Sequence, residues 1–236
     1  MLVSVIIPAL NEAENIRACA AAARREYPPD AVEIIVVDGG STDGTLDQIP
    51  ADVTRIQGPR GRAVQMNRGA AAARGEVLVF CHADSRLPAG WREAVCETLS
   101  QRGVVGGTFQ TLILPANWLW KIRNRWVFPT RWQIMFGDQA QFVRRETFIH
   151  VGGYPEIPLM EDVEMMRALH RFGRLARANS QIRVITSGRR FAERGTVRQI
   201  ALNVWNMTRY LVFGATPERI ARSYQSSRER ETGEPH

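Results

Sequence analysis

The chain has 236 residues, a net charge of +7, 44% hydrophobic residues and 23% charged residues, which excludes a fibrous or disordered protein and favours one globular domain with additions. Nearly all of the positive charge is arginine, because Lys121 is the only lysine. Arginine prefers planar anions, so the charge favours an anionic ligand or surface, unless it only reflects an arginine-rich genome.

The three cysteines, Cys19, Cys81 and Cys96, form no CxxC pair and have no metal-ligand spacing. They indicate structural thiols in a reducing compartment. The chain shows neither a secretory leader nor a run of 18 apolar residues. We therefore expect a cytoplasmic protein without a transmembrane helix, with peripheral contact at the inner face of the membrane as an open alternative.

Strands and helices alternate through the first half of the chain. Strands are predicted over 2–7, 32–37, 53–56 and 76–80. Helices are predicted over 11–25, with Asn11 as the cap, and over 42–48 and 62–73. This alternation predicts βαβ units and therefore a mainly parallel central sheet, covered by helices on both faces.

The second half is less regular. Predicted helices cover 91–101, 145–151, 161–172 and 196–213, and predicted strands cover 104–114 and 139–143. We expect a catalytic domain over residues 1–185, and a C-terminal helical extension with a mobile tail over 186–236.

Polar residues follow three of the predicted strands. These stretches are PALNE after the first strand, DGGSTDGT after the second and HAD after the fourth. In open α/β sheets the ligand lies beyond the carboxyl ends of the strands, so the three stretches indicate one shared polar ligand, together with a cation. No GxGxxG or GxxxxGK[ST] pattern occurs, which disfavours a dinucleotide or P-loop site.

The motifs IIPALNE, VVDGGSTDGT, FCHADS and LMEDVEMMRAL together resemble the family 2 glycosyltransferases, which are inverting enzymes with the Rossmann-like A-type nucleotide-sugar fold. The resemblance covers about residues 2–175. The stretch from GPRGRAVQ to ADSRLP is similar to a small soluble bacterial subgroup. The resemblance implies a nucleotide-diphosphate sugar donor, a hydroxyl acceptor and a divalent cation, Mn²⁺ or Mg²⁺.

The resemblance also implies a donor site. Asp38 would accept from the base, and Asp84 matches the metal-binding Asp of the family's DxD motif, in which His82 replaces the first Asp. Arg62 and Asn67 could reach the ribose or the diphosphate from the preceding helix. The expected donor-binding residues are Pro8, Ala9, Asn11, Glu12, Asp38, Arg62, Asn67, His82, Ala83 and Asp84.

Asp84 is the expected metal ligand, because hard cations prefer oxygen. His82 either approaches the ribose as a hydrogen-bond partner or ligates the metal. With one carboxylate fewer, we expect weaker metal binding or a preference for Mn²⁺, which accepts imidazole more readily than Mg²⁺ does.

Glu161 and Asp162 resemble the family's acidic pair. The resemblance implies that Asp162 deprotonates the acceptor hydroxyl and that Glu161 supports it, as an inverting displacement requires. Without the other motifs, an acidic first helical turn would be a sufficient explanation. On the acceptor side, the match extends to Gly137, Asp138 and Gln139, although a turn before a strand explains them as well. Further diphosphate candidates are Arg60, Arg189, Arg190 and Arg194.

Residues 115–137 contain four tryptophans and four basic residues but no acidic one, and the predicted helix 196–213 is also aromatic. Both segments could contact an anionic membrane, which would suit a lipid-linked acceptor, or they could stack on sugars or pack on the sheet. Two other classes stay open, a nucleotidyltransferase and a non-catalytic basic, aromatic membrane-binding module. No nucleic acid partner is expected.

Overall fold

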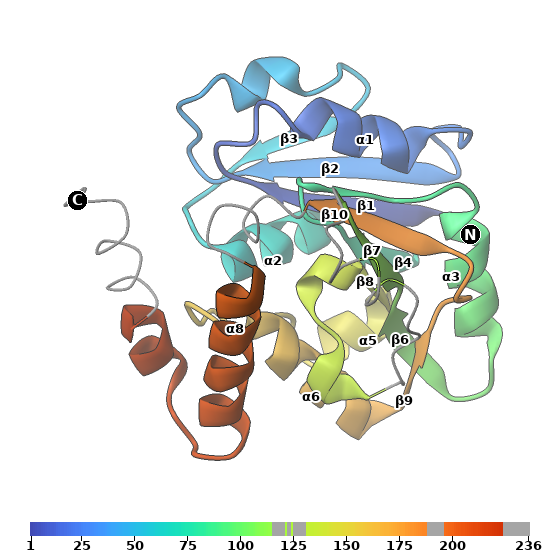
Figure 1. The fold of residues 1–236 in the computed structure, drawn as a ribbon. Coiled ribbons are helices and arrows are strands. Elements are labelled where there is room, and N and C mark those ends of the chain that lie inside the picture. The colour runs from blue at the N-terminus through green and yellow to red at the C-terminus, as the bar shows by residue number, and fades with distance from the viewer. Residues whose placement is uncertain (115–120, 122–123, 125–130, 188–195, 224–236) are drawn as a thin grey trace.

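The computed structural model describes residues 1–114, 121, 124, 131–187 and 196–223. A seven-stranded sheet forms its centre, in the order β3-β2-β1-β4-β8-β6-β9 (Figure 1). Six strands run in one direction, and β8 runs against both of its neighbours, β4 and β6. The expected mainly parallel sheet of the A-type nucleotide-sugar fold is confirmed.

The first half folds close to the predicted pattern. Its strands are β1 (Val3–Ala9), β2 (Val32–Asp38), β3 (Thr54–Gln57) and β4 (Val77–Phe80). Its helices are α1 (Ile16–Arg24), the 3₁₀ helix η1 (Thr45–Gln48) and α2 (Arg62–Ala72). Residues of β1, β2 and β4 are buried almost throughout, as expected of strands covered on both faces.

Asn11 does not cap the first helix, so that prediction is wrong. Helix α1 begins at Ile16, and Asn15 takes the cap position without a side-chain hydrogen bond to the helix backbone. Asn11 instead has a positive φ of 54° and accepts the backbone N–H of Thr42 on its side chain. Its amide therefore joins two loops, which is a longer-range use than a helix cap.

The predicted strand over 104–114 is two strands in two sheets. β6 (Val104–Thr108) lies between β8 (Gln141–Arg144) and β9 (Arg174–Arg177) in the large sheet, whereas β7 (Gln110–Leu114) joins a small sheet. The chain changes sheets at the fully buried Phe109, whose N–H donates to the carbonyl of Gln139. The alternation of residues continues through this point, so it could not reveal the break.

The small sheet has the order β5-β10-β7, with β5 (Ser85–Arg86) directly after the HAD stretch. β10 (Arg183–Ser187) pairs antiparallel with β5 and parallel with β7. Neither β9 nor β10 was predicted: both are short, and β9 has arginine at two of its four positions. β10 ends at Ser187, two residues beyond the expected domain boundary.

Two hydrophobic clusters cover the opposite faces of the large sheet. On one face, α1 and α3 (Trp91–Ser100) pack against residues of β1 and β2 such as Val5 and Ile34. On the other face, α2, α5 (Arg145–His150) and α6 (Glu161–Phe172) pack against Ile6, Ile35 and Phe80. Adjacent strand residues thus serve different faces. Helix α6 has the predicted bounds, and its position brings its first turn to the edge of the sheet where β1, β2 and β4 end.

Helix α8 (Thr196–Leu211) and a helix over residues 217–223 form the described part of the C-terminal extension. They pack on the start of α6 through Met160, Val163 and Ile220, with Met207 and Tyr210 at the margin. The division at residue 185 stays a prediction. Of the helices within the described ranges, none is both long enough and apolar enough to cross a bilayer. All three cysteines are free, with Cys19 and Cys81 buried.

Candidate active site

The loops that follow β1 and β2 are joined by hydrogen bonds. The backbone N–H of Asn11 donates to Ser41 Oγ at 2.9 Å, and that of Glu12 donates to Thr45 Oγ1 at 2.8 Å. The N–H of Ala13 donates to Asp43 Oδ2 at 3.0 Å, and this carboxylate also binds Thr45. The PALNE and DGGSTDGT stretches are therefore joined to each other, as expected if both contact one ligand.

Asp38 lies at the end of β2 and is 1% exposed. Its carboxylate accepts the backbone N–H groups of Gly40 and Ser41 at 3.0 and 3.1 Å, which closes the turn after the strand. Nearby, the buried Gln65 amide donates to the carbonyls of Ala9 and Val37 at 2.7 and 2.8 Å. No sequence motif singles out Gln65, but this side chain holds the ends of β1 and β2 together.

The HAD stretch follows β4 at the same edge of the sheet. Ala83 is buried in the core, whereas His82 and Asp84 are half-buried. Asp84 Oδ1 accepts a hydrogen bond from Ser85 Oγ at 3.3 Å. Pro8 and Ala9 end β1 alongside, so the residues expected around the donor do converge here.

The carboxylate of Asp162 lies beside the turn Gly137–Gln139, which we call the GDQ turn, and Gly137 also lies beside the HAD stretch. The backbone N–H of Gly137 donates to Asp162 Oδ2 at 2.7 Å, and the N–H of Val163 donates to Oδ1 at 2.8 Å. A Cβ added to Gly137 would lie 2.8 Å from His82 Nε2 and 3.4 Å from Asp162 Oδ2. Only glycine allows the turn to pass this closely between the imidazole and the carboxylate.

Arg62 brings a positive charge to the acidic groups. Its guanidinium donates to Glu161 Oε1 at 2.9 Å, and the side chain of Glu161 is almost fully buried. Partial desolvation would lower the pKa of Arg62, but the charges of Glu161, Asp162 and Asp84 outweigh it and raise that pKa. Burial raises the pKa of Glu161, and Arg62 opposes that rise. One guanidinium therefore offsets three carboxylates that come from two distant parts of the chain.

Replacing Arg62 with Met should lower the free energy of unfolding at pH 7.5 by about 2 kcal/mol, because it leaves the buried Glu161 carboxylate without its partner. The loss should be smaller than for a fully buried ion pair, since Arg62 is partly exposed. The folded-state pKa of Glu161 would rise further. The deficit should therefore be small at or below pH 4.5, the ordinary pKa of a Glu, and should grow as the pH rises above it.

Chemical unfolding of wild type and Arg62→Met at pH 4.5 and at pH 7.5 measures this difference. Arg68→Met is the matched control, since Arg68 is an exposed arginine on the same helix. An equal deficit at both pH values would show that Arg62 acts through packing rather than through its charge.

Asn67 and Gln139 are held by the scaffold. The Asn67 amide donates to the carbonyl of Tyr154 and accepts from its N–H, at 2.8 and 2.9 Å. Gln139 Oε1 accepts from Arg177 at 2.8 Å and from Thr108 at 3.2 Å. These contacts position the 151–160 loop and the GDQ turn, and the ribose and acceptor roles of the two residues stay predictions.

Three residues other than glycine with positive φ border the site. Asn11 belongs to the PALNE stretch, Ala140 follows the GDQ turn with a φ of 49°, and Met160 precedes Glu161 with a φ of 70°. Non-glycine residues adopt this backbone region at a cost, and such residues cluster at ligand sites. These backbone conformations occur in or next to three stretches that the motifs had indicated, namely PALNE, the GDQ turn and the start of α6. The sequence alone does not predict them.

The side chains of the site could bind a cation that takes its remaining ligands from a substrate and from water. Within the described ranges no group of three or more His, Cys, Asp or Glu side chains could hold a metal ion. Mg²⁺ commonly binds through one or two carboxylates together with substrate phosphates and water. Asp84 is a half-buried carboxylate at the open edge of the sheet, so it fits this second arrangement.

The other expected residues lie apart from these contacts or outside the described residues. Arg60 is exposed on the loop before α2. Outside the described residues lie Arg189, Arg190 and Arg194, as well as most of the tryptophan-rich segment 115–137. Of that segment, Trp132 is described, and the guanidinium of Arg167 stacks over its ring at 4.9 Å.

Comparison with known proteins places the chain in a family. The model of "Glycosyl transferase family 2" matches residues 4–154. Glycosyltransferase AglE of Haloferax volcanii is 35% identical over 119 residues, which are 46% of this chain and 39% of AglE. The probable glycosyltransferase YdaM of Bacillus subtilis is 26% identical over 197 residues, which are 72% of this chain and 47% of YdaM. The matches thus span less than half the length of either relative.

Solved structures share the fold. TarS 1-349 of S. aureus in complex with UDP-GlcNAc has a TM-score of 0.65 and 15% identity, covering 79% of this chain and 58% of that one. The mannosyltransferase PcManGT of Pyrobaculum calidifontis, in complex with GDP-Man and Mn²⁺, has a TM-score of 0.59 and 23% identity, covering 78% and 56%. At these identities the likeness supports the fold alone.

Proposed function

Because the chain belongs to glycosyl transferase family 2, we propose that it moves a sugar from a nucleoside-diphosphate sugar to a hydroxyl acceptor, with inversion at the sugar carbon. The observation that carries this proposal is the convergence of PALNE, DGGSTDGT and HAD at one sheet edge, with Asp162 held beside them by Gly137. TarS and PcManGT, which share the fold, were solved with UDP-GlcNAc and with GDP-Man. A nucleoside-diphosphate sugar is therefore the donor class that we propose.

In the proposed reaction Asp162 is the general base. An inverting displacement needs a carboxylate that takes the proton from the acceptor hydroxyl as the new bond forms. Each oxygen of Asp162 accepts one backbone N–H, which fixes the carboxylate and leaves further lone pairs for the acceptor. Glu161 and Arg62 form the ion pair behind it, so that Arg62 limits the repulsion between neighbouring carboxylates.

The leaving diphosphate gains negative charge as the bond to the sugar breaks. A divalent cation held by Asp84 would stabilise that charge when it is bound. Arg62 could add to this stabilisation, because the charges of Glu161 and Asp84 both raise its pKa. We propose that His82 orients the donor sugar from beside Gly137, and that Gly137, with Asp138, faces the acceptor.

The two other function classes receive less support. A nucleotidyltransferase would use a basic, glycine-rich loop after the first strand, whereas the loop here is acidic and hydrogen-bonded to the next one. A non-catalytic basic module would have no use for the ion pair of Arg62 with the buried Glu161 beside Asp162 and Gly137.

A thermal-shift panel tests the proposal. UDP-, GDP-, CDP- and dTDP-sugars are each added with and without Mn²⁺. We expect at least one of them to raise the melting temperature, with a larger rise when the metal is present, because a ligand that binds the folded state stabilises it. If no nucleotide sugar stabilises the protein under either condition, the transferase proposal fails.

Gly137→Ala should lower the turnover of the stabilising donor by about 10²-fold, because the new Cβ would have to displace His82 or move the turn that holds Asp162. The free energy of unfolding should fall by only about 1–3 kcal/mol. Release of the nucleoside diphosphate measures the turnover. Gly152→Ala is the control for destabilisation alone, because its Cβ would meet nothing within 4 Å while its φ of 85° strains the backbone. A similar loss of turnover in both variants would remove the special role of Gly137.

A further inference from the structure

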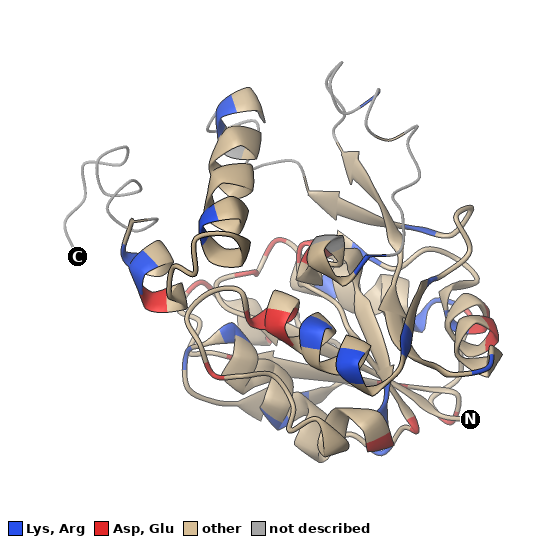
Figure 2. Cartoon of the chain, turned by 90° about the horizontal axis from the view of Figure 1, so that it is seen from below, with Lys and Arg blue, Asp and Glu red and all other residues tan. Residues whose placement is uncertain are grey.

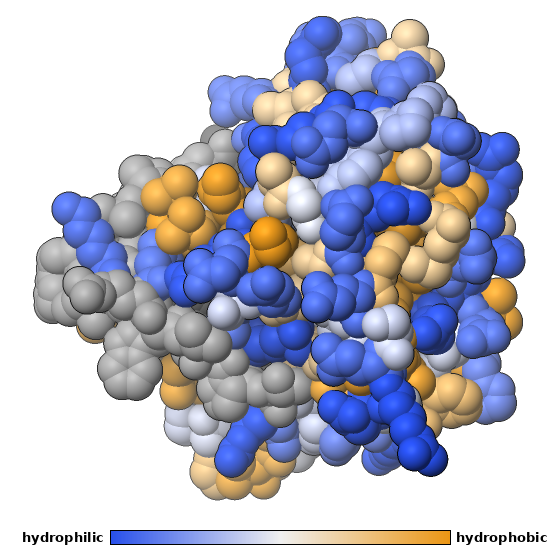
Figure 3. All heavy atoms as spheres, turned by 90° about the vertical axis from the view of Figure 1, so that its right-hand side faces the viewer, coloured by the Kyte–Doolittle hydropathy of each residue, from blue (hydrophilic) through white to orange (hydrophobic). Residues whose placement is uncertain are grey.

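Helix α8 and the turn after it expose an unusual number of large apolar side chains. Val204 is 60% exposed, Trp205 55%, Val212 71% and Phe213 68%. The full set, which we call the α8 apolar face, is Val197, Ile200, Val204, Trp205, Val212 and Phe213. Among described residues elsewhere, the exposed large apolar side chains are Met1, Leu114, Ile149 and Phe172, each on a different segment. On the opposite side of the molecule the described surface is mainly hydrophilic (Figure 3).

The α8 apolar face is separate from the face that packs on the protein. Val197, Ile200 and Val204 follow helical spacing along one stripe. Asn206 is 4% exposed, and Tyr210 bonds to Glu164 on α6, so the inward side of α8 is already satisfied. The apolar stripe is therefore not needed for the attachment of α8, and its exposure calls for a partner.

The charged residues of α8 and of the turn after it are all basic. Residues 196–217 contain Arg198 and Arg209 but no acidic residue. Figure 2 shows α8 standing out from the body of the fold with basic positions and no acidic ones. The tryptophan-rich segment before Trp132 is also basic and lacks acids. A second copy of the chain would bring these like charges together, whereas an anionic surface would complement them.

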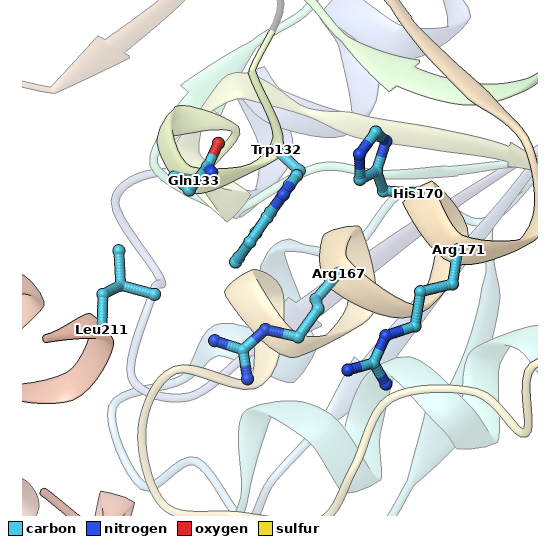
Figure 4. Close-up of a pocket in the computed structure, with 6 residues that line it drawn as sticks. All are labelled: Trp132, Gln133, Arg167, His170, Arg171 and Leu211. Carbon is cyan, nitrogen blue, oxygen red and sulfur yellow. The ribbon is translucent and has the colours of Figure 1, made fainter. Parts of the chain in front are cut away.

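A basic pocket adjoins the α8 apolar face. The pocket has a volume of about 430 Å³ and reaches α8 at Leu211, directly before the exposed Val212 and Phe213. Figure 4 shows Arg167 below the Trp132 ring and Arg171 farther along the same helix. No carboxylate of the described residues lies within salt-bridge distance of Arg171. The pocket thus offers a cation to an anionic headgroup beside apolar side chains that could enter the acyl region. Its full lining is Trp132, Gln133, Arg167, His170, Arg171 and Leu211.

We propose that the α8 apolar face and the adjoining basic pocket dock on the surface of a bilayer that contains anionic lipids. Apolar and aromatic side chains on one stripe, flanked by arginine, are the features of helices that lie in the membrane interface. The segments that adjoin α8 and the helix after it in the sequence, 188–195 and 224–236, are poor in apolar cover, because they hold only Phe191 and Tyr224 as large apolar residues. Since α8 packs at the start of α6, docking would bring the bilayer near Asp162. If the proposed function holds, a lipid-linked acceptor is then the matching substrate class.

Vesicle flotation with the full chain tests the docking. We expect the wild type to float with vesicles of phosphatidylcholine and phosphatidylglycerol, to float less with phosphatidylcholine alone, and to detach as salt is added. The double variant Val204→Ser/Trp205→Ser should lose about tenfold or more in apparent affinity. Arg171→Glu should weaken binding to the anionic vesicles only. The matched control Ile149→Ser/Phe172→Ser changes exposed apolar side chains elsewhere and should bind as the wild type does.

Three outcomes would overturn the docking. The first is unchanged binding by Val204→Ser/Trp205→Ser, and the second is equal binding of the wild type to neutral and anionic vesicles. The third is a wild type that binds no vesicles but forms a concentration-dependent dimer, which the double variant abolishes. The last outcome would assign the face to a second copy of the chain. Asp162→Asn should float like the wild type, so failure of the proposed transfer reaction and failure of docking can be told apart.

Discussion

Replacement of Asp162 by Asn should lower turnover of the donor sugar by about 10²–10⁴-fold, the usual contribution of a general base. Asn has nearly the same shape, and its single side-chain oxygen can still accept the N–H of Gly137. Its NH2 group then faces the N–H of Val163, which Asp162 also accepts, so we expect the fold to stay in place with a stability loss of about 1–3 kcal/mol. What Asn cannot do is take the proton from the acceptor hydroxyl. Donor binding should therefore change by no more than about twofold, because the base acts on the acceptor.

Release of the nucleoside diphosphate, with water or an added alcohol as the acceptor, measures the turnover, and the thermal shift with donor measures binding. Glu164→Gln is the matched control on the same helix, since Glu164 binds Arg167 and Tyr210 away from the proposed site. That variant should keep its turnover within about threefold. If Asp162→Asn keeps wild-type turnover while Glu161→Gln loses it, the base is Glu161 and the assignment of Asp162 is wrong.

The local elements of this fold were predictable because each carries its own periodic signal. Helix α6 has the predicted bounds, and strands β1, β2 and β4 lie within two residues of their predicted limits. Apolar runs between polar stretches determine such elements almost independently of the remaining chain. The same signal predicted a mainly parallel sheet, because βαβ units can close in only a few ways.

The pairings between distant segments could not be predicted in this way. β8 lies between β4 and β6 and runs against both, and the chain leaves the large sheet at Phe109 without a break in its alternation. Which strands become neighbours depends on packing over the whole domain, whereas the alternation of side chains within a strand is local. Short, arginine-rich strands such as β9 escape prediction for a related reason, since their burial is partial.

The candidate site shows the same division between local and long-range information. The motifs predicted Asp84 shortly after a strand and Asp162 in the first turn of a helix, and the structure has both residues there. The contact of Arg62 with Glu161 joins residues 99 positions apart, and nothing in either stretch of sequence predicts it. The approach of Gly137 to His82 is likewise a product of the fold. Sequence therefore indicates which side chains take part, while the structure shows which charges offset one another.

Replacement of Asp84 by Ala should remove the additional stabilisation that Mn²⁺ gives in the presence of the donor, and should lower turnover by about 10²-fold or more. Asp84 is the proposed protein ligand of a cation whose other ligands are the donor's diphosphate oxygens and water. Stabilisation by the donor without metal should persist, because the loops after β1 and β2 do not depend on Asp84. The comparison thus separates the cation from the nucleotide pocket.

Asp47→Ala is the matched control, because Asp47 is an exposed carboxylate on the nearby helix η1 and should leave the metal effect unchanged. Comparing Mn²⁺ with Mg²⁺ at limiting concentration then tests the role of His82. If the imidazole ligates the cation, His82→Asn should reduce the preference for Mn²⁺. If it only orients the donor from beside Gly137, His82→Asn should weaken donor binding equally with either metal. Retention of the full metal effect by Asp84→Ala would contradict the assignment of Asp84 and would move the cation to a different carboxylate.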